Sequence, residues 1–230
     1  MFFITGTDTD IGKTIITAGI ACILKQQGYK TAVYKPVQSG AQKTKDGLIS
    51  PDLEFVKKIS TNITLKSTYN LEAPIAPSVA AEIEKVEILP EKILKDFKSL
   101  KRDHNFVIVE GAGGILVPIY KNFLIRDLIK LLDLPLIIVS RPSLGTINHT
   151  LLTIEAAKAK NIEILGIIIS NYPEHTKDIA IKTAPKVITE IGGVEILGII
   201  PHIQNFNSDN FISVFEKNLD NQKFFTLNSH

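Results

Sequence analysis

The chain has 230 residues, of which 44% are hydrophobic, and its 26 basic and 24 acidic side chains give a formal net charge of +2. This length and composition predict one large globular domain with a sizeable buried core. The near balance of interspersed charges argues against a nucleic-acid-binding or polybasic membrane-surface protein, so a charged ligand would need a local site. The single cysteine, Cys22, excludes an internal disulfide framework and fits a reducing compartment.

No stretch of the sequence is typical of a membrane span. The apolar runs "LPLIIVS" and "ILGIIIS" are far shorter than the roughly 20 residues that a membrane helix needs. The start "MFFITG" also lacks the basic region and long apolar segment of a signal peptide. We therefore expect a soluble, cytoplasmic protein with no membrane or nucleic-acid partner.

Short apolar runs alternate with longer helical patterns along the chain. Each run is too short for a typical helix and too apolar on both sides for a solvent-facing strand, which is typical of strands inside a parallel sheet. The six predicted strands are "FFITG", "TAVYKP", "NFVIVEGAG", "LPLIIVS", "EILGIIIS" and "EILGII". Helices are predicted at about Lys13 to Gly28, Glu91 to Leu100, Arg126 to Asp133, Ile147 to Lys160 and Asp178 to Ile191. The alternation predicts an α/β fold, a mostly parallel sheet with helices on both faces in a single domain.

Two segments break this alternation. From Gln38 to about Pro90 no strand is convincing, and three prolines interrupt short helical pieces. Such a length is unusual for plain loop and predicts an insertion, residues 38–90, over the active face. Residues 205–230 are expected to be a peripheral tail that ends as a helix or as loose chain.

The stretch "GTDTDIGKT", residues 6–14, joins the first predicted strand to the first predicted helix. A strand, a glycine-containing loop and Gly-Lys-Thr at a helix start form the context of a phosphate-binding loop. Backbone N–H groups would meet the phosphate oxygens, Lys13 would supply a positive charge for the outer phosphates, and the Thr14 hydroxyl would ligate Mg²⁺. The loop predicts a nucleoside triphosphate site in a P-loop NTPase-like fold.

The loop also departs from the strict pattern. Five residues separate Gly6 from Gly12, and Thr7 stands where the first glycine is expected, so an ordinary turn with a fortuitous Gly-Lys-Thr is the alternative. Asp8 occupies the position of the signature lysine in partitioning and targeting ATPases. Asp8 would either cap the turn or act in the site, whereas we expect Asp10 to contact the site.

The predicted strands deliver charged side chains to their carboxyl ends, where ligands sit in such sheets. Lys35 ends the second strand, which we place beside the first, and would face the γ-phosphate rather than solvent. Glu110 ends the third strand, where phosphate-loop enzymes hold an acid for the metal. Asp52 would either cap a helix after Pro51 or join Thr14 and Glu110 as a Mg²⁺ ligand.

Three further loops lie at the same predicted rim. Residues Gly145 to Asn148 would offer free N–H groups at a helix start, which suit a carboxylate. Asn171 would either read a base through its amide or form a turn before Tyr172. The loop of Pro201, His202 and Ile203 follows the last strand.

These segments, in this order, resemble the dethiobiotin synthetase family. The resemblance runs from Phe2 to about Ile203 and rests on "GTDTDIGKT", "YKPVQSG", the aspartate of "SPD", "VEGAGG", "SLGTINH", "ISNYP" and "GIIPHI". The ordered set is specific, although single elements also occur in related amidoligases. Asp10 stands where a glutamate is common, and "QNFNSDN" does not show the acidic residue that family members use near the ribose.

The resemblance implies a homodimeric enzyme that converts 7,8-diaminononanoate, CO₂ and MgATP to dethiobiotin, ADP and phosphate. It implies that Lys13, Lys35 and Thr9 act in catalysis, and that the metal ligands are Thr14, Asp52 and Glu110. It implies nucleotide contacts from Asp10, Ile11, Gly12, Lys13, Thr14, Ile15, Asp52, Glu110, Gly111, Ala112, Gly113, Asn171, Tyr172, Pro201, His202 and Ile203. Ser39 and, from the second subunit, Gly145, Thr146, Ile147 and Asn148 would bind the substrate.

Two other functions fit the same fold. One is a molecular switch of the partitioning ATPase type, which would need the signature lysine that Asp8 replaces. The other is an amidoligase for a larger corrinoid acid, which would usually carry a glutamine-hydrolysing domain that 230 residues cannot hold beside this one.

Overall fold

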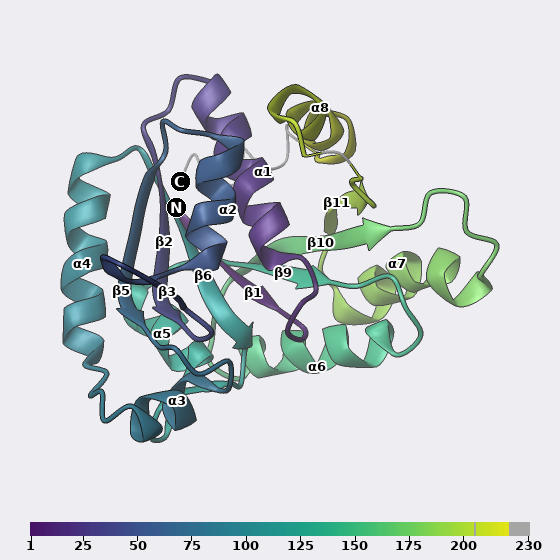
Figure 1. Cartoon of the computed structure of the whole chain (residues 1–230). Coiled ribbons are helices and arrows are strands. Elements are labelled where there is room, and N and C mark those ends of the chain that lie inside the picture. The colour runs from purple at the N-terminus through teal and green to yellow at the C-terminus, as the bar shows by residue number, and fades with distance from the viewer. Residues whose placement is uncertain (205, 221–230) are drawn as a thin grey trace.

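A computed structural model describes residues 1–204 and 206–220 (Figure 1). Seven parallel strands form one sheet in the order β11-β10-β9-β1-β6-β2-β5. The strands are β1 (Phe2–Gly6), β2 (Thr31–Gln38), β5 (Thr64–Asn70), β6 (Phe106–Gly114), β9 (Leu136–Ser140), β10 (Ile164–Tyr172) and β11 (Ile196–Pro201). Two antiparallel hairpins lie outside this sheet, β3 (Gln42–Thr44) with β4 (Gly47–Ile49) and β7 (Pro118–Tyr120) with β8 (Phe123–Leu124). The predicted α/β fold is confirmed.

Helices cover both faces of the sheet, which is why the central strands are apolar on both sides. One face packs against α1 (Lys13–Gln26), α2 (Pro51–Ile59) and α8 (Ser208–Asn218). The other face packs against α4 (Pro90–Asp103), α5 (Ile125–Leu132), α6 (Thr146–Lys158) and α7 (Ile179–Gly192), and α3 (Pro77–Ile83) lies beside β7. Every residue of β1 and β9 is buried. No helix in the described part of the chain is long and apolar enough to cross a bilayer.

The prediction of no strand between Gln38 and Pro90 is wrong. β5 lies in this segment and pairs in parallel with β2 at the edge of the sheet, with Lys35 opposite Ser67. Its sequence, "TLKSTYN", is largely polar because an edge strand is only partly covered, so it lacks the apolar run of a buried strand. β5 and α2, which lie within residues 38–90, belong to the α/β core. The placement of residues 38–90 over the active face stays a prediction.

The order of the strands in the sheet differs from expectation in one detail. The first and second predicted strands are not neighbours, because β6 lies between β1 and β2. The segment 205–230, expected at the periphery, contributes α8, whose Phe211 and Phe215 are fully buried against the core. Residues 205 and 221–230, the end of the predicted tail, lie outside the described residues.

Candidate active site

The loop between β1 and α1 is built around Gly12. Gly12 is the N-cap of α1 and has φ of 92°, in the left-handed region that favours glycine. A Cβ atom at this position would overlap the Ser170 hydroxyl on β10. The close approach of the loop backbone to Ser170 therefore requires glycine at position 12. The first N–H groups of α1 have no partners within the helix, so they are available to bind an anion.

The variant Gly12→Ala is expected to bind the non-hydrolysable ATP analogue AMPPNP, with Mg²⁺, at least about tenfold more weakly. The left-handed conformation costs a non-glycine residue about 1–2 kcal/mol, and the methyl group also displaces the loop or Ser170. The measurement is isothermal titration calorimetry. Gly28→Ala is the matched control, because Gly28 has φ of 84° with open space around it. Wild-type affinity in Gly12→Ala would show that the loop does not bind the phosphates.

Lys13 and Lys35 bring two ammonium groups to this loop from different elements. Lys13 begins α1, is 8% exposed, and donates a hydrogen bond to the backbone oxygen of Asp8 at 2.9 Å. Lys35 is 3% exposed near the end of β2, which contradicts the alternative of a solvated surface lysine. Burial, and next the charge of Lys35, lowers the pKa of Lys13 to about 8.

Two carboxylates and a backbone carbonyl surround the Lys35 ammonium group. Lys35 Nζ lies 2.5 Å from Asp52 Oδ2 and 2.8 Å from Glu110 Oε1, and it donates to the Gly111 carbonyl at 3.0 Å. Thr14 Oγ1 donates to the same Glu110 oxygen at 2.9 Å. Side chains from α1, β2, α2 and β6 therefore meet at one point, at the carboxyl ends of β2 and β6.

Electrostatics keep this cluster charged despite its burial. Burial disfavours the charged form of Lys35, but Glu110 and then Asp52 outweigh it and raise the pKa of Lys35. Burial likewise opposes ionisation of Asp52, and the neighbouring Lys35 lowers the pKa of Asp52 in spite of it. Asp52 is not the cap of its helix, because the Ser50 side chain accepts the hydrogen bond from Leu53 N. The metal-ligand alternative for Asp52 is the one that this geometry favours.

A cavity of about 370 Å³ opens onto the cluster. It is lined by Thr9, Asp10, Gly12, Lys13, Thr14, Ile15, Lys35, Gln38, Ser39, Asp52, Glu110, Ala112 and Gly113. All but Gln38 are residues that the sequence had predicted. Gly111 takes part through its carbonyl oxygen, which Lys35 contacts.

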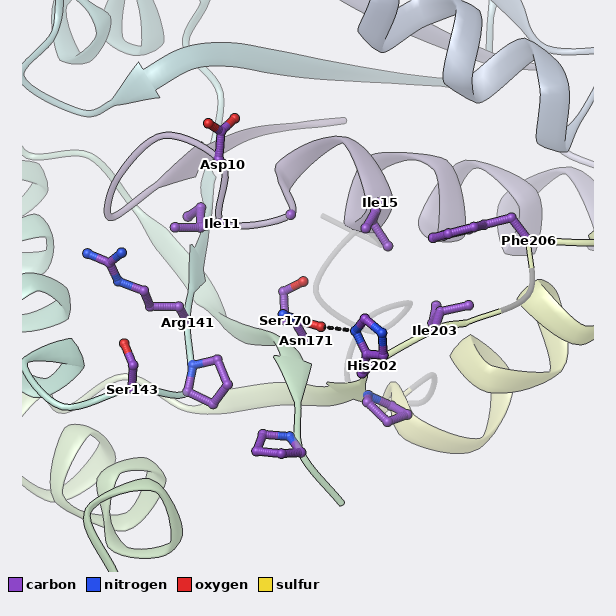
Figure 2. A pocket seen from close by; sticks show the side chains of 14 residues that line it. Asp10, Ile11, Ile15, Arg141, Ser143, Ser170, Asn171, His202, Ile203 and Phe206 are labelled. Atoms are coloured by element: carbon purple, nitrogen blue, oxygen red, sulfur yellow. Dashed lines mark hydrogen bonds between the residues drawn. The ribbon is translucent and has the colours of Figure 1, made fainter. Parts of the chain in front are cut away.

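A second cavity of about 660 Å³ adjoins the first and shares Asp10, Gly12 and Ile15 with it. Figure 2 shows Ile11 and Ile15 on the α1 side and Asn171 and His202 on the opposite side. The other lining residues are Arg141, Pro142, Ser143, Ser170, Pro173, Pro201, Ile203 and Phe206. His202 Nδ1 lies 2.5 Å from Asn171 Oδ1, and Asn171 lines the cavity. Asn171 has φ of 59° but belongs to β10, at a register shift against β11, and not to the turn that follows.

Some predicted site residues lie outside both cavities of this protomer. Tyr172 follows Asn171 on β10 but does not line the second cavity. Gly145, with φ of 91°, is the N-cap of α6 and is exposed, as is Asn148. Residues 145–148 line neither cavity. A single copy of the chain therefore does not bring them to the Lys35 cluster.

Sequence reasoning missed Gln38, Arg141 and Phe206. Gln38 is the last residue of β2, and Arg141 is the first residue after β9. The rule that ligands sit at strand ends, which predicted Lys35, would also have predicted them. Phe206 gives no such signal, since no strand ends beside it. Asp8 accepts a hydrogen bond from Thr9 N, which is the main cause that lowers the pKa of Asp8, and it also pairs with Arg141 at 2.8 Å. These contacts favour the structural role of Asp8 in the turn.

Known proteins resemble this chain along most of its length. Residues 1–210 match a family model described as an AAA domain. An ATP-dependent dethiobiotin synthetase BioD from Thermodesulfovibrio yellowstonii is 40% identical over 98% of this chain and 98% of its own. The same enzyme from Anoxybacillus flavithermus is 43% identical over 92% of this chain and 96% of its own. The chain belongs to the ATP-dependent dethiobiotin synthetase family.

Solved structures show that the fold of this synthetase chain is widely shared. The cell division ATPase MinD of Pyrococcus furiosus superposes with a TM-score of 0.60 at 15% identity, covering 98% of this chain and 99% of its own. A MinC:MinD cell division complex from Aquifex aeolicus gives a TM-score of 0.61 at 17% identity, covering 94% of this chain and 93% of that chain. Because these identities are low, the likeness establishes the phosphate-loop fold alone.

Proposed function

We propose that this chain is an ATP-dependent ligase of biotin synthesis that carboxylates 7,8-diaminononanoate with CO₂ and closes the ring to give dethiobiotin, ADP and phosphate. The observation that carries the proposal is the meeting of two lysines, Lys13 and Lys35, with Asp52, Glu110 and Thr14 at one cavity beside the phosphate loop. Family membership at about 40% identity over nearly the whole chain supports it.

The proposed reaction has three steps, and negative charge collects on the carbamate and the γ-phosphate that meet in the second. An amine of the substrate adds to CO₂ and loses a proton to give a carbamate. A carbamate oxygen then attacks the γ-phosphorus of ATP, which releases ADP and leaves a carbamic-phosphoric anhydride. The second amine attacks the carbonyl carbon, closes the ureido ring and expels phosphate. Alignment and charge neutralisation supply most of the catalysis of phosphoryl transfer.

Each lysine has a separate task in this scheme. Lys13, at the start of α1, binds the outer phosphate oxygens together with the loop N–H groups. Lys35, on the far side of the cluster, holds the carbamate oxygen and the γ-phosphoryl group against each other. Thr9 and Ser39 line the same cavity and are placed to hydrogen-bond the diamine or its carbamate.

The oxygen ligands suit Mg²⁺. Within the described residues no group of three or more His, Cys, Asp and Glu side chains could hold a metal, so an all-protein metal cage is absent there. Mg²⁺ in phosphate-transfer sites instead uses one or two carboxylates and phosphate oxygens. Asp52 and Glu110 already share one cation, Lys35, and Thr14 lies 2.9 Å from the Glu110 oxygen. When bound, Mg²⁺ neutralises charge on the phosphates.

The second cavity suits the nucleoside. It continues from the phosphate loop past Ile15, and its walls combine apolar side chains with the amide of Asn171. This composition is typical of a base-binding site, in which apolar contact gives affinity and a few polar groups give orientation. We assign Asn171 and the loop of Pro201, His202 and Ile203 to adenine. Tyr172, which follows Asn171 on β10, would contact adenine through its backbone.

The substrate carboxylate would bind at residues 145–148 of a second copy of the chain. These residues lie outside both cavities of their own protomer. Next to them Leu144 and Leu152 are 86% and 59% exposed, which favours an interface there. The protein would then be a homodimer with two shared sites.

A mixture of Lys35→Ala and Gly145→Trp protomers is expected to regain about a quarter of wild-type activity. Random pairing makes half of the dimers mixed, and each mixed dimer has one site with both an intact Lys35 and an intact substrate loop. Each variant alone is expected to be inactive. Mixing should follow dissociation and reassociation, with the dimer verified by analytical ultracentrifugation. No recovery in verified mixed dimers would place both residues in the same protomer's site.

The proposed function is tested by incubating the protein with 7,8-diaminononanoate, ¹³C-bicarbonate and MgATP. We expect dethiobiotin that carries one ¹³C atom, detected by mass spectrometry, together with one ADP per product. A folded protein that binds MgATP but forms no dethiobiotin would contradict the proposal.

A further inference from the structure

Gln38 and Ser50 form a hydrogen bond that closes the base of the β3–β4 hairpin. Both side chains are buried, at 6% and 4% exposure. Ser50 Oγ donates to Gln38 Oε1 at 2.6 Å, and Gln38 Nε2 donates to the backbone oxygen of Ser39 at 2.7 Å. Because the Ser39 carbonyl can only accept, it must face the Gln38 amide nitrogen, and the Gln38 oxygen is therefore directed toward Ser50.

The same Ser50 hydroxyl starts helix α2. It accepts a hydrogen bond from Leu53 N at 3.2 Å, and Pro51 occupies the first helical position. Asp52 is the next residue, so its place depends directly on where and in which direction the helix begins. One buried hydroxyl thus uses its hydrogen for Gln38 and its lone pair for the helix that carries Asp52.

Strand β2 carries Lys35 and, through the bond from Gln38 to Ser50, also contacts the start of the helix that carries Asp52. Lys35 and Gln38 are on the same strand, three residues apart, and Lys35 pairs with Asp52 at 2.5 Å. The covalent connection from β2 to α2 runs through residues 39–49, which include a hairpin with exposed residues. The hydrogen bond therefore connects the strand directly to the helix start, beside the Lys35–Asp52 ion pair.

We propose that Gln38 and Ser50 are positioning residues, a clamp that holds the start of α2 against the end of β2 and so places Asp52 opposite Lys35 and the metal. The proposal rests on the proposed function only in taking Asp52 as a metal ligand. Ser50 does not line the cavity, so it acts through Asp52 and not on the substrate. Partners behind metal ligands typically change metal affinity by about 10–100-fold when they are removed.

The test measures Mn²⁺ binding in the presence of AMPPNP by electron paramagnetic resonance of free Mn²⁺. Ser50→Ala removes both bonds, and Gln38→Met keeps the helix cap but removes the clamp. Both are expected to weaken Mn²⁺ binding about tenfold. Ser50→Thr, which keeps the hydroxyl, is expected to retain wild-type affinity. The matched control is Asp178→Ala, which removes a side-chain cap from α7 and should leave Mn²⁺ affinity unchanged.

The double variant separates a clamp from two independent effects. If one bond is responsible, Gln38→Met combined with Ser50→Ala should bind Mn²⁺ no more weakly than the weaker single variant. Unchanged affinity in Ser50→Ala, with or without an effect of Gln38→Met, would overturn the clamp, because Gln38 also lines the cavity. Thermal unfolding of each variant verifies that it is folded.

The clamp and the proposed function can fail separately. Wild-type protein that binds Mn²⁺ in an Asp52-dependent way but makes no dethiobiotin would overturn the function and leave the clamp supported by the variants. Wild-type protein that makes dethiobiotin, with Mn²⁺ affinity unaffected in Ser50→Ala and Gln38→Met, would overturn the clamp alone.

Discussion

Lys35→Ala is expected to lower the turnover number for dethiobiotin synthesis by about 10³-fold while MgATP affinity changes by less than about tenfold. Loss of one fixed group that stabilises transition-state charge typically costs about 10²–10³ in rate. Affinity is spared because Lys13 and the loop N–H groups bind the phosphates. Turnover is followed by dethiobiotin mass and affinity by calorimetry.

The control for this variant is Lys57→Ala, which removes an exposed lysine from α2 and should retain full turnover. Removal of Lys35 also leaves Asp52 and Glu110 as two neighbouring carboxylates without their shared cation. We therefore expect Lys35→Ala to unfold at lower temperature without Mg²⁺ and to regain stability when Mg²⁺ is added. Near wild-type turnover in Lys35→Ala would remove Lys35 from the mechanism.

Glu110→Gln and Asp52→Asn are expected to raise the Mg²⁺ concentration needed for half-maximal turnover by about 10–100-fold. Each change removes one negative charge and one strong oxygen ligand while it keeps the side-chain shape. Glu110→Gln should have the larger effect, because Glu110 also accepts from Thr14.

Mg²⁺ titrations at saturating ATP measure this requirement. Glu54→Gln serves as the matched control on α2, since Glu54 is partly exposed and pairs with the exposed Lys57 at 3.5 Å. Titration curves that overlay the wild type in both Glu110→Gln and Asp52→Asn would take these carboxylates out of the metal site.

The strongest predictions from the sequence concerned residues at the ends of apolar strands. Glu110 and Lys35 follow buried runs, and a parallel sheet must bring such ends to one edge. The Gly-Lys-Thr at the start of α1 could be recognised because a strand and a helix flank it. The sequence therefore predicts that these residues share one edge of the sheet, whereas the ion pairs of Lys35 with Asp52 and Glu110 are known only from the structure.

Other features depended on packing that local patterns do not encode. β5 was missed because an edge strand needs no continuous apolar run, and the order β1-β6-β2 is a matter of how strands far apart in sequence pair. Phe211 and Phe215 of α8 have no strand-end signal, and they are buried because α8 packs against α1. The Gln38–Ser50 bond joins residues across a hairpin, so it becomes visible only in three dimensions.

The loop chemistry also separates this chain from a molecular switch on the same fold. Solved structures with the same fold include MinD proteins, yet they are only 15–18% identical to this chain. Asp8 stands where a switch would carry its signature lysine, and its carboxylate is engaged within the turn and with Arg141. In the proposed mechanism, Lys35 of β2 is the second cation instead.

A crystal structure with Mg²⁺ and AMPPNP tests the central claim most directly. We predict that the triphosphate lies against residues 12–14, that the metal contacts Thr14, Asp52 and Glu110, and that the Lys35 ammonium group moves from Asp52 to the γ-phosphate. A triphosphate bound elsewhere, or Lys35 still held between the two carboxylates with the nucleotide in place, would contradict the account.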